Sequence, residues 1–177
     1  ASPYENNWGI MFDILANYDL NVTSLYFRID GHPSPSESIR VFVYQRQCSS
    51  TRGTFANIDT SCSYIGHELH REDWNLQGQQ GRQNGTFARV NTTVNNGTIL
   101  EVEIQPVAVK ARSQMGFLIF VQQVVNYYFA GTEESDSCTS FEVCPQCFDS
   151  FGGLMPAVLL QGASADSNTA PEAFTYL

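Results

Sequence analysis

Residues 87–107 read FARVNTTVNNGTILEVEIQPV, and this stretch contains two runs in which apolar and polar side chains alternate. The second run places Leu100, Val102 and Ile104 between acidic and amide residues. A period of two is typical of a β-strand with one face in a core and the other in water. The intervening Asn95-Asn96-Gly97 favours the tight turn of a β-hairpin. The stretch therefore predicts an antiparallel hairpin formed by Phe87–Val94 and Ile99–Val107.

The same alternation recurs on both sides of this hairpin, whereas helical periodicity is nearly absent. The third of the expected strands turns Ile39, Val41 and Val43 inward, and the strand 117–125 is apolar on both faces, which is typical of a central strand. The other expected strands are Trp8–Ala16, Leu25–Ile29, Leu154–Gln161 and Phe174–Leu177. About eight to ten short strands predict an all-β fold, a two-sheet antiparallel β-sandwich of Ig-like or jelly-roll type. Residues 1–177 form one domain in this interpretation.

The charge balance argues against two classes of partner. The net charge is −9, and Lys110 is the only lysine beside eight arginines. An acidic surface repels phosphate backbones and anionic headgroups, so we expect no nucleic-acid partner. The longest apolar run, residues 116–121, is far shorter than the roughly 20 residues of a membrane-spanning helix. We therefore expect no membrane insertion.

Three features indicate an extracellular protein, either secreted or held at a cell surface. Five cysteines lie in polar, turn-rich stretches of the kind that carry disulfides in oxidising compartments. Four Asn-x-Thr sequons predict N-linked glycans. We expect Ala1-Ser2-Pro3 to be a mature end left after a leader was removed. The predicted glycosylation sites are Asn21, Asn84, Asn91 and Asn96.

The cysteine spacing predicts disulfides but not all of their connectivity. Cys48 and Cys62 bound a long Ser/Thr/Gly loop that a disulfide can close. Cys138 can pair with Cys144 or with Cys147, which leaves one thiol spare. Cys144-Pro-Gln-Cys147 is also a redox-type C-x-x-C spacing, but no helical pattern follows it to stabilise a thiolate, so a structural role is the better interpretation.

Residues that suggest other chemistry lack the spacing that such chemistry needs. His67 and His70 are three residues apart, and on a strand such residues point to opposite faces, so a solvated polar edge is favoured over a zinc site. Glu133, Glu134 and Asp136 match no calcium loop. No nucleophile motif or phosphate loop is present. We therefore expect no catalytic residue, metal or cofactor, and we interpret the chain as not being an enzyme. The remaining enzymatic alternative is a hydrolase whose paired carboxylates cannot be recognised from the sequence.

The outward-facing aromatics of the predicted sheets have two interpretations. Phe42 and Tyr44 alternate with inward residues of the third strand, and Tyr26 has the same phase in the second. Exposed rings on a sheet can stack on sugars or bury against partners. Alternatively, these rings pack under a loop or glycan of the same domain.

A pattern of strands resembles a known group of proteins. It comprises Gly9–Ala16, Val41–Tyr44, Trp74, Phe117–Val121 and Phe174–Tyr176. These segments are similar to uncharacterised secreted domains of algal and related extracellular proteins. In size and style the chain is also similar to protomers of extracellular fibrils that assemble by donor-strand exchange. The resemblance implies a polymerising, structural role and brings no catalytic residues.

The first strand is compatible with that role. Its alternating large apolar side chains cannot stay exposed without aggregating, so it either completes its own sandwich or fills a groove of another copy. Residues 1–16 are therefore a candidate donor or linking strand, and the sequence leaves both alternatives open. The interface residues would be Trp8, Ile10, Phe12 and Ile14. We expect a non-enzymatic structural subunit of a glycosylated extracellular filament or coat that pairs with itself; the alternative is a carbohydrate-binding or adhesion domain on a cell surface.

Overall fold

The computed structural model describes residues 9–30, 39–68, 70–77, 86–94, 97–121, 151, 153–160 and 163–165. These residues form two antiparallel β-sheets, which confirms the predicted all-β sandwich. The strands are β1 (Gly9–Ala16), β2 (Leu20–Asp30), β3 (Ile39–Arg46), β4 (Trp74–Gln77), β5 (Thr86–Val94), β6 (Gly97–Val109), β7 (Ser113–Val121), β8 (Ala157–Leu159) and β9 (Ala163–Ala165). A 3₁₀ turn, η1 (Arg71–Asp73), precedes β4. Within the described ranges, no helix has the length and apolarity needed to span a membrane.

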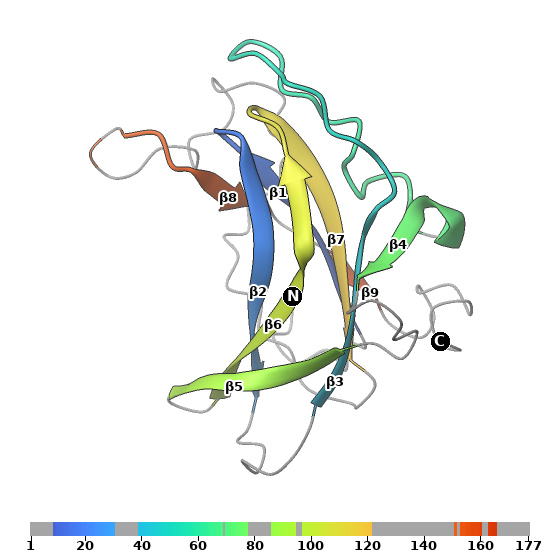
Figure 1. Cartoon of the computed structure of the whole chain (residues 1–177), viewed down its shortest axis with the longest axis vertical. Coiled ribbons are helices and arrows are strands. Elements are labelled where there is room, and N and C mark those ends of the chain that lie inside the picture. The colour runs from blue at the N-terminus through green and yellow to red at the C-terminus, as the bar shows by residue number, and fades with distance from the viewer. Residues whose placement is uncertain are drawn as a thin grey trace.

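The strands follow the order β2-β6-β5-β3-β7-β1-β8, with β4 beside β3 and β9 beside β1. Strand β5 belongs to both layers, because its first residues, 86–88, pair with β3 and residues 89–94 pair with β6. We call the layer of β1, β3, β4, β7, β8 and β9 sheet A, and the layer of β2, β6 and most of β5 sheet B. Figure 1 shows β5 crossing between the layers at one end of the sandwich.

The main core lies between the two sheets. The inward sets predicted for β3 and β6 are confirmed, since Ile39, Val41 and Val43 are buried opposite Leu100 and Val102. Glu103 and Gln105 of β6 are exposed, as its alternation predicts. The hairpin of β5 and β6 is confirmed as well, with Val94 paired to Gly97. Burying such side chains contributes about 1.5–3 kcal/mol each before ordering costs.

Sheet A is buried on its outer face too, because residues 47–73 fold back across it. Phe42 and Tyr44 pack there with Trp74, Met11 and Leu118 in a second apolar cluster. The interpretation of Phe42 and Tyr44 as exposed outward rings is therefore wrong, and the alternative, that they lie under a loop of the same domain, holds. The central, doubly buried position predicted for residues 117–125 is confirmed for residues 117–119, which are buried in β7 between β1 and β3, while residues 122–125 lie outside the described ranges.

Strand β1 is an interior strand of sheet A in this chain. All its residues are buried, and it pairs along its whole length with β7. Its other edge pairs with β8 and β9, each only three residues long. Three of the candidate interface residues, Ile10, Phe12 and Ile14, lie in the core of their own chain, while Trp8 is outside the described residues. Of the predicted closing strand 154–161, only residues 157–159 form a described strand, β8, and residues 174–177 lie outside the described ranges.

Candidate functional site

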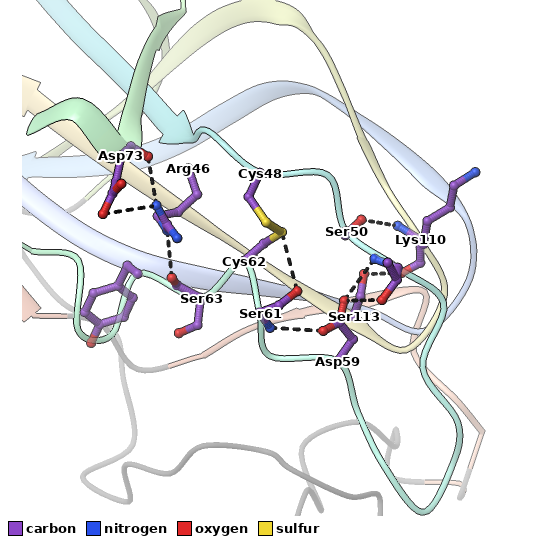
Figure 2. The surroundings of a disulfide bond; sticks show 12 residues. Arg46, Cys48, Ser50, Asp59, Ser61, Cys62, Ser63, Asp73, Lys110 and Ser113 are labelled. Atoms are coloured by element: carbon purple, nitrogen blue, oxygen red, sulfur yellow. Dashed lines mark hydrogen bonds and ion pairs between the residues drawn. A yellow bond between two sulfur atoms is a disulfide. The ribbon is translucent and has the colours of Figure 1, made fainter. Parts of the chain in front are cut away.

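The loop that covers sheet A is held by a disulfide between Cys48 and Cys62, whose Cα atoms are 5.6 Å apart. This confirms the predicted pairing. Figure 2 shows the bond with Arg46 and Ser63 on one side and Asp59 and Ser61 on the other. Polar side chains thus gather on both flanks of the disulfide. The other three cysteines, Cys138, Cys144 and Cys147, lie outside the described residues.

A buried carboxylate lies under this loop. Asp13 on β1 is only 2% exposed, and it accepts hydrogen bonds from Ser63 Oγ (2.5 Å) and from the backbone N–H of Tyr64 (2.9 Å). Burial raises the pKa of the Asp13 carboxyl above its usual value, although these two hydrogen bonds and the charge of Arg46 act in the opposite direction. Asp13 therefore ties the first strand to the covering loop.

A buried arginine fixes the same loop from the other strand. Arg46 Nε donates to the carbonyl of Ser63 (3.0 Å), and Nη1 donates to the carbonyl of Asp73 (2.9 Å). Gly116, which pairs with Asp13 in the sheet, makes this approach feasible. A Cβ at Gly116 would lie 2.7 Å from both Arg46 Cγ and Tyr64 N. A glycine within an apolar strand is a sequence signal for such a close backbone approach.

The two histidines singled out in the sequence have separate acidic neighbours. His67 Nδ1 lies 2.6 Å from Asp73 Oδ2, and this hydrogen bond is the main cause of a lowered pKa at Asp73. His70 faces Glu72 at 3.5 Å. The carbonyl of His67 accepts a hydrogen bond from Trp74 Nε1 (2.9 Å), which joins the histidine to the second apolar cluster. In the part of the chain that the structure describes, no three His, Cys, Asp or Glu residues are grouped to hold a metal ion.

Ser63, His67 and two aspartates resemble the parts of a hydrolytic triad, but their bonds connect them differently. A triad requires the serine to bond a histidine that is oriented by the carboxylate. Here Ser63 donates to Asp13, while His67 bonds Asp73. Ser63 is also buried. The cluster therefore acts as a clamp that holds residues 63–73 against sheet A.

The distal part of the loop has an anchor of its own. Asp59 accepts hydrogen bonds from the N–H and the hydroxyl of Thr51 and from the N–H of Ser61. Burial would raise the pKa of Asp59, but these hydrogen bonds outweigh it and lower the pKa. The loop thus keeps a fixed shape between its cysteines.

Two of the predicted glycosylation sites lie on described strands of sheet B. Asn21 is exposed near the start of β2, just before a register shift between Val22 and Ser24. Asn91 is exposed on β5, with its Nδ2 3.5 Å from Glu101 Oε2. Asn84 and Asn96 lie outside the described residues. No family model, curated protein sequence or solved structure matches this chain.

Proposed function

We propose that this chain is a non-enzymatic structural subunit of a glycosylated extracellular filament or coat. The observation that carries the proposal is the edge of sheet B. Strand β2 has 11 residues and ends the strand order, and no described strand pairs with its outer side. An edge strand presents unpaired N–H and C=O groups to which a further strand can add. A Cys48–Cys62 disulfide is compatible with an oxidising, extracellular setting.

The joint that we propose lies in the second half of β2. From Ser24 to Asp30 the strand pairs with β6 without a register shift, so its outer side is regular. The first half is blunted by the irregularity between Val22 and Ser24 and by the predicted glycan on Asn21. Strands β2 and β8 stand at the two ends of the strand order and present different edges. A contact between β2 of one copy and β8 of the next joins two different surfaces and is therefore head-to-tail. Contacts of this kind form open filaments where the rotation between copies does not close into a ring.

Exchange of strand β1 is the competing mode of assembly. The turn that follows β1 would have to open, and β1 would then pair with β7 of another copy instead of its own. Opening would break the hydrogen bonds of Asn17 to the carbonyls of Met155 (2.5 Å) and Pro156 (2.9 Å). This cost, together with the buried position of β1, is why we place the joint at β2.

Light scattering and negative-stain microscopy of the full-length glycosylated protein test the proposal. We expect particles larger than a monomer. Lysine is a residue with which natural edge strands avoid pairing, so Tyr26→Lys should dissociate them. Tyr18→Lys is the matched control, because Tyr18 is exposed to 54% and Tyr26 to 55% but Tyr18 lies outside β2. A full-length protein that stays monomeric at high concentration would contradict the structural role.

Deletion of residues 1–16 separates the two modes of assembly. Joining through β2 leaves β1 essential to its own domain, so the deleted chain should unfold. Joining by strand exchange should instead give a folded subunit that cannot polymerise and that is stabilised by the added peptide. Circular dichroism and light scattering distinguish these results.

A further inference from the structure

Three links between strands, at residues 17–19, 52–55 and 110–112, meet at one end of the sandwich and carry positively charged and aromatic side chains. The Asp19 carboxylate after β1 accepts hydrogen bonds from the N–H of Ala111 (2.8 Å) and from Arg52 Nη2 (2.5 Å). The N–H of Gly53 donates to the carbonyl of Ala111 (3.0 Å). These bonds hold the three links together. We call the side chains they carry the turn surface: Tyr18, Arg52, Phe55, Lys110 and Arg112.

The turn surface is locally cationic in a protein of net charge −9. Two carboxylates bonded to these links are engaged, Asp19 by Ala111 and Arg52, and Asp59 by its own loop. Among the described residues, neither Lys110 nor Arg112 has an ion-pair partner. Figure 2 shows the Lys110 side chain extending away from Ser50 and the disulfide. Lys110 is exposed, whereas Arg112 is half-buried and its buried Nε has no hydrogen-bond partner among the described residues.

Arg112 occupies a backbone conformation that costs stability. Its φ is 58°, the left-handed region in which glycine is favoured. Its carbonyl accepts a hydrogen bond from the N–H of Asp59 (3.0 Å), and Gly53 lies so close that a Cβ there would clash with that carbonyl at 2.1 Å. Strained residues of this kind concentrate at functional sites. The loop is therefore built closely around an arginine where a glycine would be easier to accommodate.

The guanidinium of Arg112 is also oriented. Its Cζ lies 4.3 Å from the centre of the Phe55 ring, a cation–π distance. Phe55 and Tyr18 are exposed to 53% and 54%. A stacked guanidinium retains in-plane N–H donors for an oxyanion, which it can bind through two hydrogen bonds. Exposed rings offer apolar faces to a flat ligand.

We infer that the turn surface binds an anionic polysaccharide, with Arg112 and Lys110 contacting its carboxylate or sulfate groups and the aromatic rings contacting its pyranose faces. A nucleic acid offers similar groups, but its dense charge would be repelled by the acidic remainder of the protein. Sparse charges on a neutral sugar backbone avoid that repulsion. The inference goes beyond the proposed structural role and does not rest on it, because a monomer would bind equally well.

Dextrans that share one backbone test this assignment by calorimetry on the full-length protein at about 0.15 M salt. We expect binding to a sparsely substituted carboxymethyl-dextran or a sparsely sulfated dextran, and none to neutral dextran. Lys110→Gln and Arg112→Gln should each weaken binding about tenfold or more, as expected for the loss of a charge-assisted hydrogen bond. Arg89→Gln is the matched control, because it removes an exposed positive charge from sheet B and should leave affinity unchanged.

Two further measurements keep the result unambiguous. Arg112→Gly removes the charge while relieving the backbone strain, so it should lose binding without losing thermal stability. Poly-glutamate and single-stranded DNA serve as other polyanions. Equal binding of either one, an equal loss in Arg89→Gln, or no binding to both charged dextrans would overturn the inference.

Discussion

The outer faces of the two sheets differ in what covers them, although both arise from the same alternation of residues. On sheet A, Phe42 and Tyr44 point away from the sandwich core and are nonetheless fully buried beneath residues 47–73. On sheet B, Tyr26 has the equivalent direction and is 55% exposed beside Glu101. The difference teaches that strand alternation decides which face a side chain lies on, whereas a distant loop decides whether that face meets water. Stability is therefore concentrated on one outer face, while the other is available for contacts.

The largest expected difference between the faces concerns their aromatic residues. Trp74→Ala should lower the free energy of unfolding by about 4 kcal/mol, because it empties a packed site and removes a hydrogen bond to His67. Tyr26→Ala should change it by less than about 0.5 kcal/mol. Urea unfolding curves of the two variants measure both values. Similar losses would mean that sheet B is covered as well.

The next largest effect should come from the disulfide that closes the loop over sheet A. Replacing Cys48 and Cys62 together by alanine should cost about 3 kcal/mol, since the bond closes a loop of 14 residues in sequence separation. Because buried Trp74 packs in one cluster with Tyr64, which follows Cys62 closely, its fluorescence should also shift to longer wavelength. Non-reducing peptide mapping of the native protein provides the direct check. Recovery of both cysteines as free thiols would falsify the disulfide.

The sequence predicted one face of each strand better than the other, for a physical reason. Alternation at Val41 and Val43 indicates a buried face because the pattern is local. The cover over Phe42 comes from Tyr64 and Trp74, more than 20 residues away, in a segment without periodicity. Two residues that interrupt apolar strands, Asp13 and Gly116, were the available signals. They are paired in the sheet, and one binds the loop while the other gives it room.

The turn surface could not be predicted from the sequence, because residue types alone do not indicate its backbone conformation or which residues it brings together. Glycine or asparagine normally indicates a left-handed backbone, and Arg112 occupies one without that signal. Likewise Tyr18, Arg52 and Lys110 are distant in sequence and are brought together by Asp19. Such a site depends on the pairing of strands, which the sequence indicates only in part.

A smaller and opposite pair of effects should appear on titration of the two loop aspartates. The pKa of Asp13 is raised in the folded chain, so Asp13 adds stability at low pH and that stability is lost as the pH rises through the folded pKa. The pKa of Asp59 is lowered, so Asp59 adds stability at neutral pH and loses it as the pH falls. Relative to Asp13→Asn, the wild type should therefore become less stable as the pH rises from about 3 to 7. Relative to Asp59→Asn, the wild type should become more stable over the same range. Urea unfolding at several pH values measures both differences in free energy of unfolding. Two differences that change with pH in the same direction would contradict the opposite pKa shifts.

The smallest effect on stability should come from the sugar on sheet B. Asn91 and Thr93 of its sequon are both exposed on β5, and the side-chain amide contacts only Glu101 among the bonds of the described strands. A glycan there would cover the outer face of sheet B much as the loop covers that of sheet A, but without filling a packed site. We therefore expect Asn91→Gln to lower the intact mass by one glycan and to change the free energy of unfolding by less than about 0.5 kcal/mol. Asn21→Gln is the companion variant, because Asn21 lies on the edge strand β2 and the loss of its glycan should promote association between copies rather than unfolding. Mass spectrometry before and after glycosidase treatment checks the first expectation, and light scattering of the two variants checks the second. An unmodified mass for the wild-type protein would remove the glycan from sheet B and leave its outer face bare.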